Sequence, residues 1–209
     1  MWSIDPRRTA HLVIDMQRDF VEEGRPMEVP MARRRLPQMA ELLQHSRRYQ
    51  IPVIYTQHVL LDSFDVSPLE TARQPLLKKV GMRHGTDGIE IVDELAPLEG
   101  EVSIVKHRFD AFHNTQLETV LNTIRGFRGV DTLIISGTLT EVCCESTARS
   151  GFMRDFKIVF ASESTGALSD AAQSATEDAM GKFFGRVMTN QEIIRETSDE
   201  AMRRQEGQA

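Results

Sequence analysis

Short apolar runs alternate with segments of helical periodicity, and this alternation constrains the fold more than any other feature of the sequence. Each run is long enough for a strand and too short for a helix. The runs span Ala10–Asp15, Pro52–Gln57, Ser103–Lys106, Thr132–Gly137, Lys157–Ser162 and Arg186–Thr189. Continuous apolar runs are typical of strands that are buried on both faces, and strand–helix alternation places such strands in a parallel sheet. The sequence therefore predicts an α/β fold, a three-layer α/β/α sandwich around a six-stranded, mainly parallel sheet.

The segments between these runs carry the helix signals. Apolar residues repeat at helical spacing over residues 36–43. Thr115 is predicted to open a helix, with Glu118 three residues later completing a capping box. Further helices are expected to start near Glu141, to cover roughly Ala171–Phe184 and to run from Gln191 onward. This succession of strands and helices makes the expected architecture Rossmann-like.

Composition and charge narrow the class of protein. The 209 residues suffice to bury a core, and we expect one domain over residues 1–209. No apolar run approaches the ~20 residues that span a bilayer, and the first residues form no apolar signal region, so we expect a cytoplasmic protein with no membrane partner. The net charge of −6 argues against a nucleic-acid partner, and the basic run Arg33–Arg35 is too short to change this.

The two cysteines, Cys143 and Cys144, are adjacent in the sequence. Neighbouring cysteines cannot staple distant parts of a fold, and the chain has no third cysteine to pair with either of them. They also cannot supply the spaced ligands of a structural zinc site. A disulfide framework and a cysteine zinc site are therefore both excluded.

Three residues with reactive side chains lie at the predicted strand ends where open parallel sheets bind ligands. Asp15 ends the first strand, Lys106 ends the third, and Cys143 follows the fourth. Thr140 is predicted to cap the helix that carries Cys143, so that the helix dipole and Lys106 favour the thiolate. Asp15 can exchange a proton with the thiol and with a leaving group. Each residue also has an ordinary structural interpretation, as a buried hydrophobe, a turn residue or a solvated lysine, and spacing alone does not decide between the two.

Three blocks of the sequence resemble the signature motifs of the isochorismatase-like cysteine hydrolases. They are VIDMQRDF at 13–20, VKHRFDAFHNT at 105–115 and SGTLTEVCCESTA at 136–148, and the resemblance covers about residues 8–195. It implies a catalytic triad of Asp15, Lys106 and Cys143. It also selects Cys143 rather than Cys144 as the nucleophile, because the family's nucleophile follows a Thr-x-x pattern.

The same resemblance implies features of the backbone. A cis peptide bond is expected between Thr138 and Leu139, and the backbone N–H groups of Leu139 and Cys143 are expected to form an oxyanion hole. Within the family, the run from Lys106 to Leu117 and the segment CCESTAR are most similar to ureidoacrylate-type amidohydrolases.

Two departures from the family pattern bear on the site. Glu141 stands where relatives often have Asn, which can change the helix start or the charge of the pocket. Nicotinamidases of the family bind a metal through an Asp and histidines after the second strand, whereas this chain offers only His58 there. We therefore predict no metal and no cofactor. The remaining histidines, His11, His45, His84, His107 and His113, show no ligand spacing.

The substrate pocket is harder to predict than the reactive residues. Gln17, Phe20, Phe109 and Phe112 flank the signature residues and are candidates to line a pocket for a small planar acyl group, although the phenylalanines can equally be core residues. The long connection Val59–Gly88 is rich in proline and glycine and has weak periodicity. A connection of this length in a compact domain usually serves as a lid or a pocket wall.

These observations predict a hydrolase that cleaves a C–N bond of a small amide or ureide through an acyl-thioenzyme. The nearest alternative is isochorismatase-type hydrolysis of an enol ether, which needs no cysteine nucleophile. A non-catalytic oligomeric assembly module is a second alternative, but it predicts loss of triad members, and none is lost. Redox chemistry by Cys143 and Cys144 is opposed by their adjacency. The resemblance also implies a homo-oligomer, a dimer or a tetramer, that acts on a small-molecule substrate.

Overall fold

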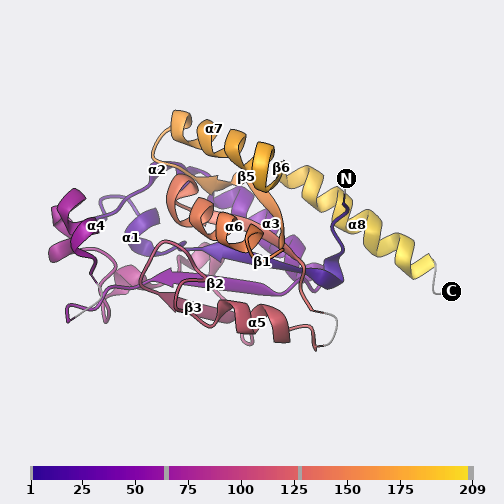
Figure 1. Cartoon of the computed structure of the whole chain (residues 1–209), viewed down its shortest axis with the longest axis horizontal. Helices are drawn as coiled ribbons and strands as arrows, with labels where there is room; N and C mark the ends of the chain where they lie inside the picture. Colours follow the sequence, from indigo (N-terminus) through magenta and orange to yellow (C-terminus); the bar gives the residue numbers. More distant parts are fainter. Residues whose placement is uncertain (1, 64–65, 127–128, 207–209) are drawn as a thin grey trace.

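Six strands form the centre of the fold in the order β3-β2-β1-β4-β5-β6 (Figure 1). The structure is a computed structural model, and it describes residues 2–63, 66–126 and 129–206. The strands are β1 Thr9–Ile14, β2 Val53–His58, β3 Val102–Lys106, β4 Thr132–Thr138, β5 Lys157–Gly166 and β6 Gly185–Met188. Every pair of neighbouring strands is parallel. The predicted α/β sandwich is thus confirmed, with a sheet that is parallel between all six of these strands.

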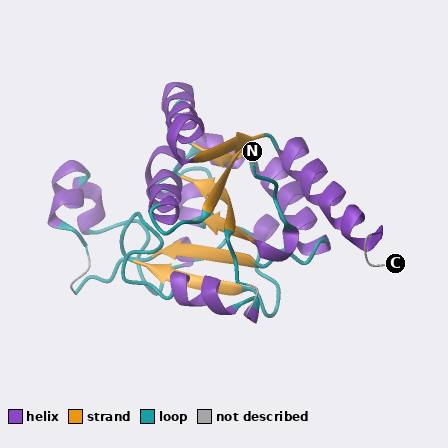
Figure 2. Cartoon of the chain, turned by 45° about the vertical axis from the view of Figure 1, so that its right-hand side comes forward, coloured by secondary structure: helices purple, strands orange, loops and turns teal. Residues whose placement is uncertain are grey.

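Helices cover both faces of the sheet (Figure 2). The α-helices are α1 Arg18–Val21, α2 Pro30–Arg34, α3 Leu36–Arg48, α4 Pro68–Arg73, α5 Leu117–Thr123, α6 Glu145–Phe152, α7 Asp170–Ala179 and α8 Asn190–Glu206. Shorter turns are the 3-10 helices η1 Pro6–Arg8, η2 Pro75–Lys78, η3 Asp87–Ile89 and η4 Asp93–Leu95, and the π-helices η6 Thr140–Cys144 and η7 Met180–Phe184. Among the described residues, no helix combines the length and the apolar character needed to cross a membrane.

The alternation of side chains along β1 explains why its sequence is apolar throughout. Leu12 and Ile14 pack in one buried cluster with residues of α5 and α6, including Leu117. Val13 points to the other face and packs with residues of α3, including Met39. Because successive side chains of a strand point to opposite faces, a strand between two helical layers has no polar side.

Two predicted helix starts differ from the structure. Helix α5 begins at Leu117 rather than at Thr115, and the Glu118 carboxylate accepts a hydrogen bond from Arg154 instead of closing a capping box. Thr140 is the first residue of η6 and not its cap, because its hydroxyl donates to the Gln173 side chain at 2.7 Å. The Thr115 hydroxyl still accepts a hydrogen bond from the Leu117 N–H at 3.1 Å, so at α5 only the Glu118 half of the capping box is replaced by a tertiary bond.

The ends of β1 and β4 approach each other closely. Ile14 and Gly137 are register partners, and a Cβ atom on Gly137 would lie 2.0 Å from the Ile14 carbonyl oxygen. Gly137 has a φ of +116°, a conformation that only glycine adopts readily. Asp15, directly after β1, has a φ of +49°, which turns the chain out of the sheet. Only glycine at position 137 thus allows the two strand ends to lie this close.

Candidate active site

The carboxyl ends of β1, β3 and β4 bring Asp15, Lys106 and Cys143 together. The Lys106 ammonium nitrogen lies 2.6 Å from Asp15 Oδ2 and 3.6 Å from Cys143 Sγ. Asp15 and Lys106 are fully buried, and Cys143 is 3% exposed. The ends of β1, β2, β3 and β4, together with these side chains, are called the floor of the site below. The three residues that the sequence placed at one sheet edge are thus in mutual contact.

Hydrogen bonds fix the carboxylate and the ammonium on the floor. The Thr56 hydroxyl, from the neighbouring strand β2, donates to Asp15 Oδ1 at 2.6 Å. The Lys106 ammonium also donates to the Arg108 carbonyl oxygen at 3.0 Å. These bonds leave Asp15 Oδ2 beside Lys106, and the Asp15 carboxylate also contacts the Cys143 thiol. A buried carboxylate next to an ammonium can exchange a proton with a neighbouring thiol without either charge meeting bulk water.

Burial governs the protonation of the thiol. It raises the pKa of Cys143 far above the ordinary value, and the charge of Asp15 raises it further, while Lys106 and a backbone hydrogen bond from Leu139 lower it. The pKa of Lys106 is also raised, because Asp15 and Cys143 outweigh the desolvation that acts against its charge. Lys106 thus favours the thiolate, as expected, but burial and the charge of Asp15 outweigh it. The arrangement instead pairs a protonated thiol with an adjacent proton acceptor.

The backbone around Leu139 faces the same thiol. The peptide bond between Thr138 and Leu139 is cis, at the position that the family resemblance implies. The Leu139 carbonyl oxygen accepts the N–H of Val142 and of Cys144, which closes the first turn of η6. The Leu139 backbone also contacts the Cys143 thiol from its amide side. Backbone N–H groups at such a turn can stabilise negative charge on an oxygen.

Cys143 and Cys144 point into different surroundings. Cys143 lines a cavity of about 580 Å³ that opens above the floor. Cys144 is fully buried, and its sulfur faces the Ser136 carbonyl oxygen at 4.0 Å in the core under β4. Burial raises the pKa of Cys144 as well. Only Cys143 of the pair reaches the space in which a substrate can bind.

The cavity lining contains two of the four predicted pocket residues. Phe20 and Phe109 line it together with Cys143 and Leu139. Gln17 does not, because its amide clamps the end of β2 through hydrogen bonds with the backbone N–H and carbonyl of His58. Phe112 does not either, because it packs in the core. The pocket assignments of Gln17 and Phe112 are therefore wrong.

The cavity is also lined by Met27, His58, Val142 and Leu168. The other lining residues come from the segment Val59–Gly88, called the lid below, of which residues 64–65 lie outside the described residues. Helix α4 and η2 of the lid contribute most of these side chains, and Figure 1 shows α4 standing apart from the helices that cover the sheet. The base of the lid is closed by hydrogen bonds from Leu60 N–H to the Met82 carbonyl and from His84 N–H to the Leu60 carbonyl. The lid residues that line the cavity are Leu69, Glu70, Arg73, Gln74, Leu77 and Met82.

Two buried polar atoms in this lining were missed by the sequence reasoning. His58 Nε2 and Glu70 Oε2 each lack a hydrogen-bond partner among the residues that the structure describes. Burial keeps the pKa of His58 well below its usual range, so the ring is neutral, and burial raises the pKa of Glu70. Glu70 lies in a segment of weak periodicity, and His58 was weighed only as a metal ligand, so neither stood out.

One group of residues on the floor has the donor atoms of a metal site. Ligand atoms of Asp15, His58 and Cys143 all lie within 4.8 Å of one another. The Lys106 ammonium, however, already occupies the space beside Asp15 and Cys143. A cation on the same atoms would lie against that positive charge, so the three residues do not fit a metal while Lys106 is protonated.

Glu141 lies beside the site but does not line the cavity. Its carboxylate accepts a hydrogen bond from the Leu168 backbone N–H at 3.1 Å. Leu168 itself is part of the lining. The replacement of the family's usual Asn by Glu141 thus bears on the support of one wall, and its charge is not presented to the cavity.

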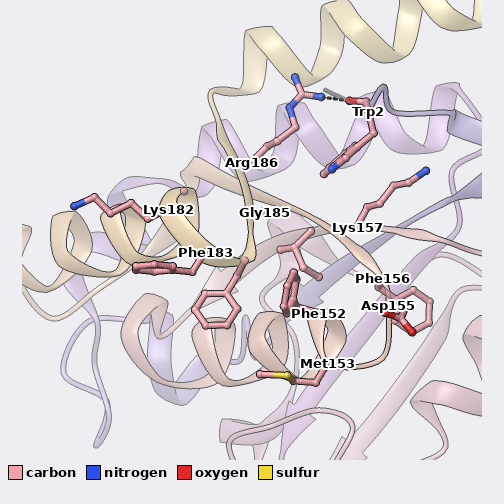
Figure 3. Close-up of a pocket in the computed structure, with 13 residues that line it drawn as sticks. Trp2, Phe152, Met153, Asp155, Phe156, Lys157, Lys182, Phe183, Gly185 and Arg186 are labelled. Atoms are coloured by element: carbon pink, nitrogen blue, oxygen red, sulfur yellow. Dashed lines mark hydrogen bonds between the residues drawn. The ribbon is translucent and has the colours of Figure 1, made fainter.

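A second cavity, of about 620 Å³, lies at the opposite edge of the sheet, where β5 and β6 begin. Figure 3 shows the rings of Phe152, Phe156 and Phe183 around it, with Trp2 nearby. Its basic side chains are neutralised within the protein: Lys157 pairs with Asp131, Lys182 with Asp178 and Arg186 with Glu196. This cavity brings together no nucleophile with an acid or base.

Comparison with known proteins gives one consistent match. Residues 9–192 match the family model described as the Isochorismatase domain. The ureidoacrylate amidohydrolase RutB of Caulobacter vibrioides is 31% identical over 205 residues, which cover 89% of this chain and 89% of that protein. The crystal structure of a cysteine hydrolase from Pseudomonas syringae pv. phaseolicola 1448A is 32% identical, with a TM-score of 0.88 and coverage of 96% of this chain and 97% of that chain.

A second solved structure agrees with the first. An isochorismatase family protein from Desulfovibrio vulgaris is 30% identical, with a TM-score of 0.81 and coverage of 94% of this chain and 98% of that chain. The residues that match the family model include Asp15, Lys106 and Cys143. They also include the strands that these residues end or follow, and most of the surrounding helices. The family predicted from the three sequence blocks is therefore confirmed, and this chain belongs to the isochorismatase-like hydrolase family.

Proposed function

We propose that this protein hydrolyses the C–N bond of a small amide or ureide through an acyl-thioenzyme on Cys143. The observation that carries the proposal is the contact on the floor, where Lys106 Nζ lies 2.6 Å from Asp15 and 3.6 Å from a thiol that faces the cavity. A thiol, a proton acceptor and a fixed positive charge are the parts that covalent acyl transfer requires.

The first half of the reaction forms the thioester. Asp15 Oδ2 takes the thiol proton as the Cys143 sulfur attacks the substrate carbonyl carbon, so the thiolate exists only while it reacts. The carbonyl oxygen becomes an oxyanion and accepts hydrogen bonds from the backbone N–H groups of Leu139 and Cys143. When the C–N bond breaks, Asp15 returns its proton to the leaving nitrogen, and an amine or ammonia departs.

The second half releases the acid. A water molecule gives a proton to Asp15 and attacks the thioester carbonyl, and the same N–H groups stabilise the oxyanion. The C–S bond then breaks, the sulfur recovers the proton from Asp15, and a carboxylic or carbamic acid leaves. Lys106 stays protonated throughout, since its pKa is raised, and it balances the charge that moves between Asp15 and Cys143.

The relatives support amide chemistry in general terms. One is named as an ureidoacrylate amidohydrolase and one as a cysteine hydrolase. Enol-ether hydrolysis, the alternative reaction, would leave a buried thiol beside Asp15 without a role. The proposal therefore rests on the thiol, and its test must address that atom.

Mass spectrometry of the enzyme quenched during turnover tests this proposal. The enzyme is offered a panel of small amides and ureides, selected by ammonia release, and the quenched protein is digested. We expect an acyl adduct on the peptide that carries Cys143, placed on that residue by fragmentation. The Cys143→Ala variant is expected to lose at least about a thousandfold in kcat/KM.

Cys144→Ala is the matched control, because it removes the neighbouring thiol from a position that does not reach the cavity. This variant is expected to keep most of the activity. An adduct on Cys144, or full activity in Cys143→Ala, would show that the thioester proposal is wrong. Cleavage of isochorismate by Cys143→Ala at the wild-type rate, with no amide turned over, would establish the enol-ether reaction in its place.

A further inference from the structure

The mechanism leaves two polar atoms of the cavity unused. His58 Nε2, at the end of β2, and Glu70 Oε2, on helix α4 of the lid, are both buried, line the cavity and lack partners among the described residues. A buried polar atom without a hydrogen bond is unfavourable, so such atoms in a binding cavity mark the places where a ligand supplies the missing partner.

The two atoms differ in what they can accept. His58 is neutral and within 4.8 Å of Asp15 and Cys143, so it lies beside the scissile bond of any substrate. Glu70 is on helix α4 of the lid and not at the sheet edge, and its oxygen can only accept hydrogen bonds once it is ionised. A substrate whose carbonyl reacts at Cys143 therefore meets Glu70 from the lid side of the cavity.

The charge of Glu70 is incompletely balanced. Burial raises the pKa of its carboxyl, and the positive charges of Arg108 and Lys106 act against that rise without cancelling it. Lys106 is engaged by Asp15 at 2.6 Å. Arg73, one turn later on α4, lines the same cavity, but it is exposed, so water screens its charge. A ligand with a positive or N–H-donating end would stabilise the ionised carboxyl.

The lining of the cavity that contains Glu70 and Cys143 is mainly apolar. Phe20, Met27, Leu77, Met82 and Phe109 provide its walls. A cavity with such walls and few polar groups takes up a hydrocarbon segment and uses the polar groups to orient it. The lining thus matches a short apolar chain with a reacting carbonyl at one end and a hydrogen-bond donor at the other.

We propose that Glu70 determines specificity, by selecting an amide or ureide that carries an amino group or another N–H donor at the end away from the reacting carbonyl and by rejecting one that carries a carboxylate there. This inference rests on the proposed amide hydrolysis and adds the substrate class to it. It separates this chain from the relative named for ureidoacrylate, because an acrylate end would place a second carboxylate against Glu70.

Calorimetric titration of the Cys143→Ala variant tests this selection without turnover. The probes are 4-aminobutanamide, pentanamide and succinamate, which share an amide and a similar length and end in an ammonium, a methyl group and a carboxylate. We expect the ammonium probe to bind most tightly and the carboxylate probe most weakly. Adding Glu70→Gln should remove the advantage of the ammonium over the methyl probe, a loss of about tenfold in its affinity, and should tighten succinamate.

Glu90→Gln is the matched control, because it removes the same charge from an exposed position near the lid that does not line the cavity. It should leave the order of the three probes unchanged. The proposal is overturned if succinamate binds most tightly, if Glu70→Gln preserves the original order, or if none of the probes binds. If the order holds but the wild-type enzyme releases no ammonia from any amide, the specificity role stands and the proposed hydrolysis fails.

Discussion

On the floor of the cavity the reactive side chains are buried, paired and held at the ends of the sheet strands, whereas on the lid the side chains lie on short helices and are largely exposed. Asp15 and Lys106 have no accessible surface, while Leu69 on the lid is 78% exposed. The floor is held in place by the backbone ladders of the sheet, and the lid by a few contacts at its base. We infer that changes on the floor act on chemistry and folding together, and that changes on the lid act on substrate binding.

Removal of the charge at Lys106 should have the largest effect. Lys106→Met leaves the Asp15 carboxylate buried without its ion-pair partner, which typically costs about 3–5 kcal/mol. We expect a loss of this size in the free energy of unfolding, measured in urea, together with a loss of at least about a thousandfold in kcat/KM. Lys182→Met, which breaks an exposed pair with Asp178, should change neither. If Lys106→Met proves as stable as the wild type, the floor does not couple chemistry to folding.

Low pH should lower the free energy of unfolding through His58, which lies on the floor. Burial keeps the pKa of the folded His58 well below 6.5, so as the pH falls below about 6.5 the unfolded chain binds a proton that the folded protein does not. Stability therefore falls with pH, by about 1.4 kcal/mol per pH unit for this group, or about 2–3 kcal/mol over two units. His58→Gln should reduce the slope of unfolding free energy against pH by this amount below about pH 6.5.

His84→Gln is the lid control for this measurement, because His84 is exposed. It should leave the slope unchanged. His11 is also buried, with a pKa of about 3, so a residual slope is expected in His58→Gln. An unchanged slope in His58→Gln would mean that this ring is not held neutral on the floor.

Substitution of Asp19 should loosen the connection between the floor and the lid. The buried Asp19 carboxylate accepts a hydrogen bond from the Met82 backbone N–H at 2.6 Å and so ties α1 to the base of the lid. Asp19→Ala leaves that N–H unsatisfied, at a cost of about 1–3 kcal/mol. We expect KM to rise more than kcat falls in steady-state kinetics. Asp93→Ala, which breaks an exposed pair with Arg18, should leave KM unchanged. An equal loss in kcat would place Asp19 with the floor.

The smallest effect is expected at Leu69, on the exposed side of the lid. Leu69→Ala removes a side chain that is 78% exposed yet contributes to the cavity wall. The unfolding free energy should change by less than about 0.5 kcal/mol, while KM for an apolar amide should rise a few-fold. Leu98→Ala, an exposed leucine outside the cavity, should change neither quantity. A stability loss as large as that of Asp19→Ala would show that the lid is packed like the floor.

The floor was predictable from sequence because its signals are periodic and local. Buried parallel strands read as apolar runs, and the edge where they end fixes where Asp15, Lys106 and Cys143 meet. The bounds of β5 were less well predicted, since its polar end at 163–166 lies beyond the apolar run. The match of the three blocks to one family then distinguished Cys143 from Cys144.

The lid and the hydrogen bonds around the floor were not predictable in the same way. Thr140 is of a residue type that commonly caps helices, but its hydroxyl donates to Gln173, which is distant in sequence. Gln17 and Phe112 adjoin signature residues, yet one is held by the backbone of β2 and the other by the core. Glu70 faces the cavity only because the folded chain brings α4 of the lid next to the floor. In each case the deciding partner lies on another element, which a one-dimensional pattern does not encode.

The close approach of Gly137 to Ile14 limits which positions can be mutated to give this protein a new substrate specificity. A side chain at position 137 would force apart the strand ends that precede Asp15 and Cys143, so variant libraries at that position would return mostly unfolded clones. Helix α4 of the lid has no such restriction, because it contains no glycine and because backbone hydrogen bonds between Leu60, Met82 and His84 close the base of the lid. Recombination of lids between relatives, with crossovers at Leu60 and Met82, would therefore exchange substrate preference while the reacting atoms keep their positions.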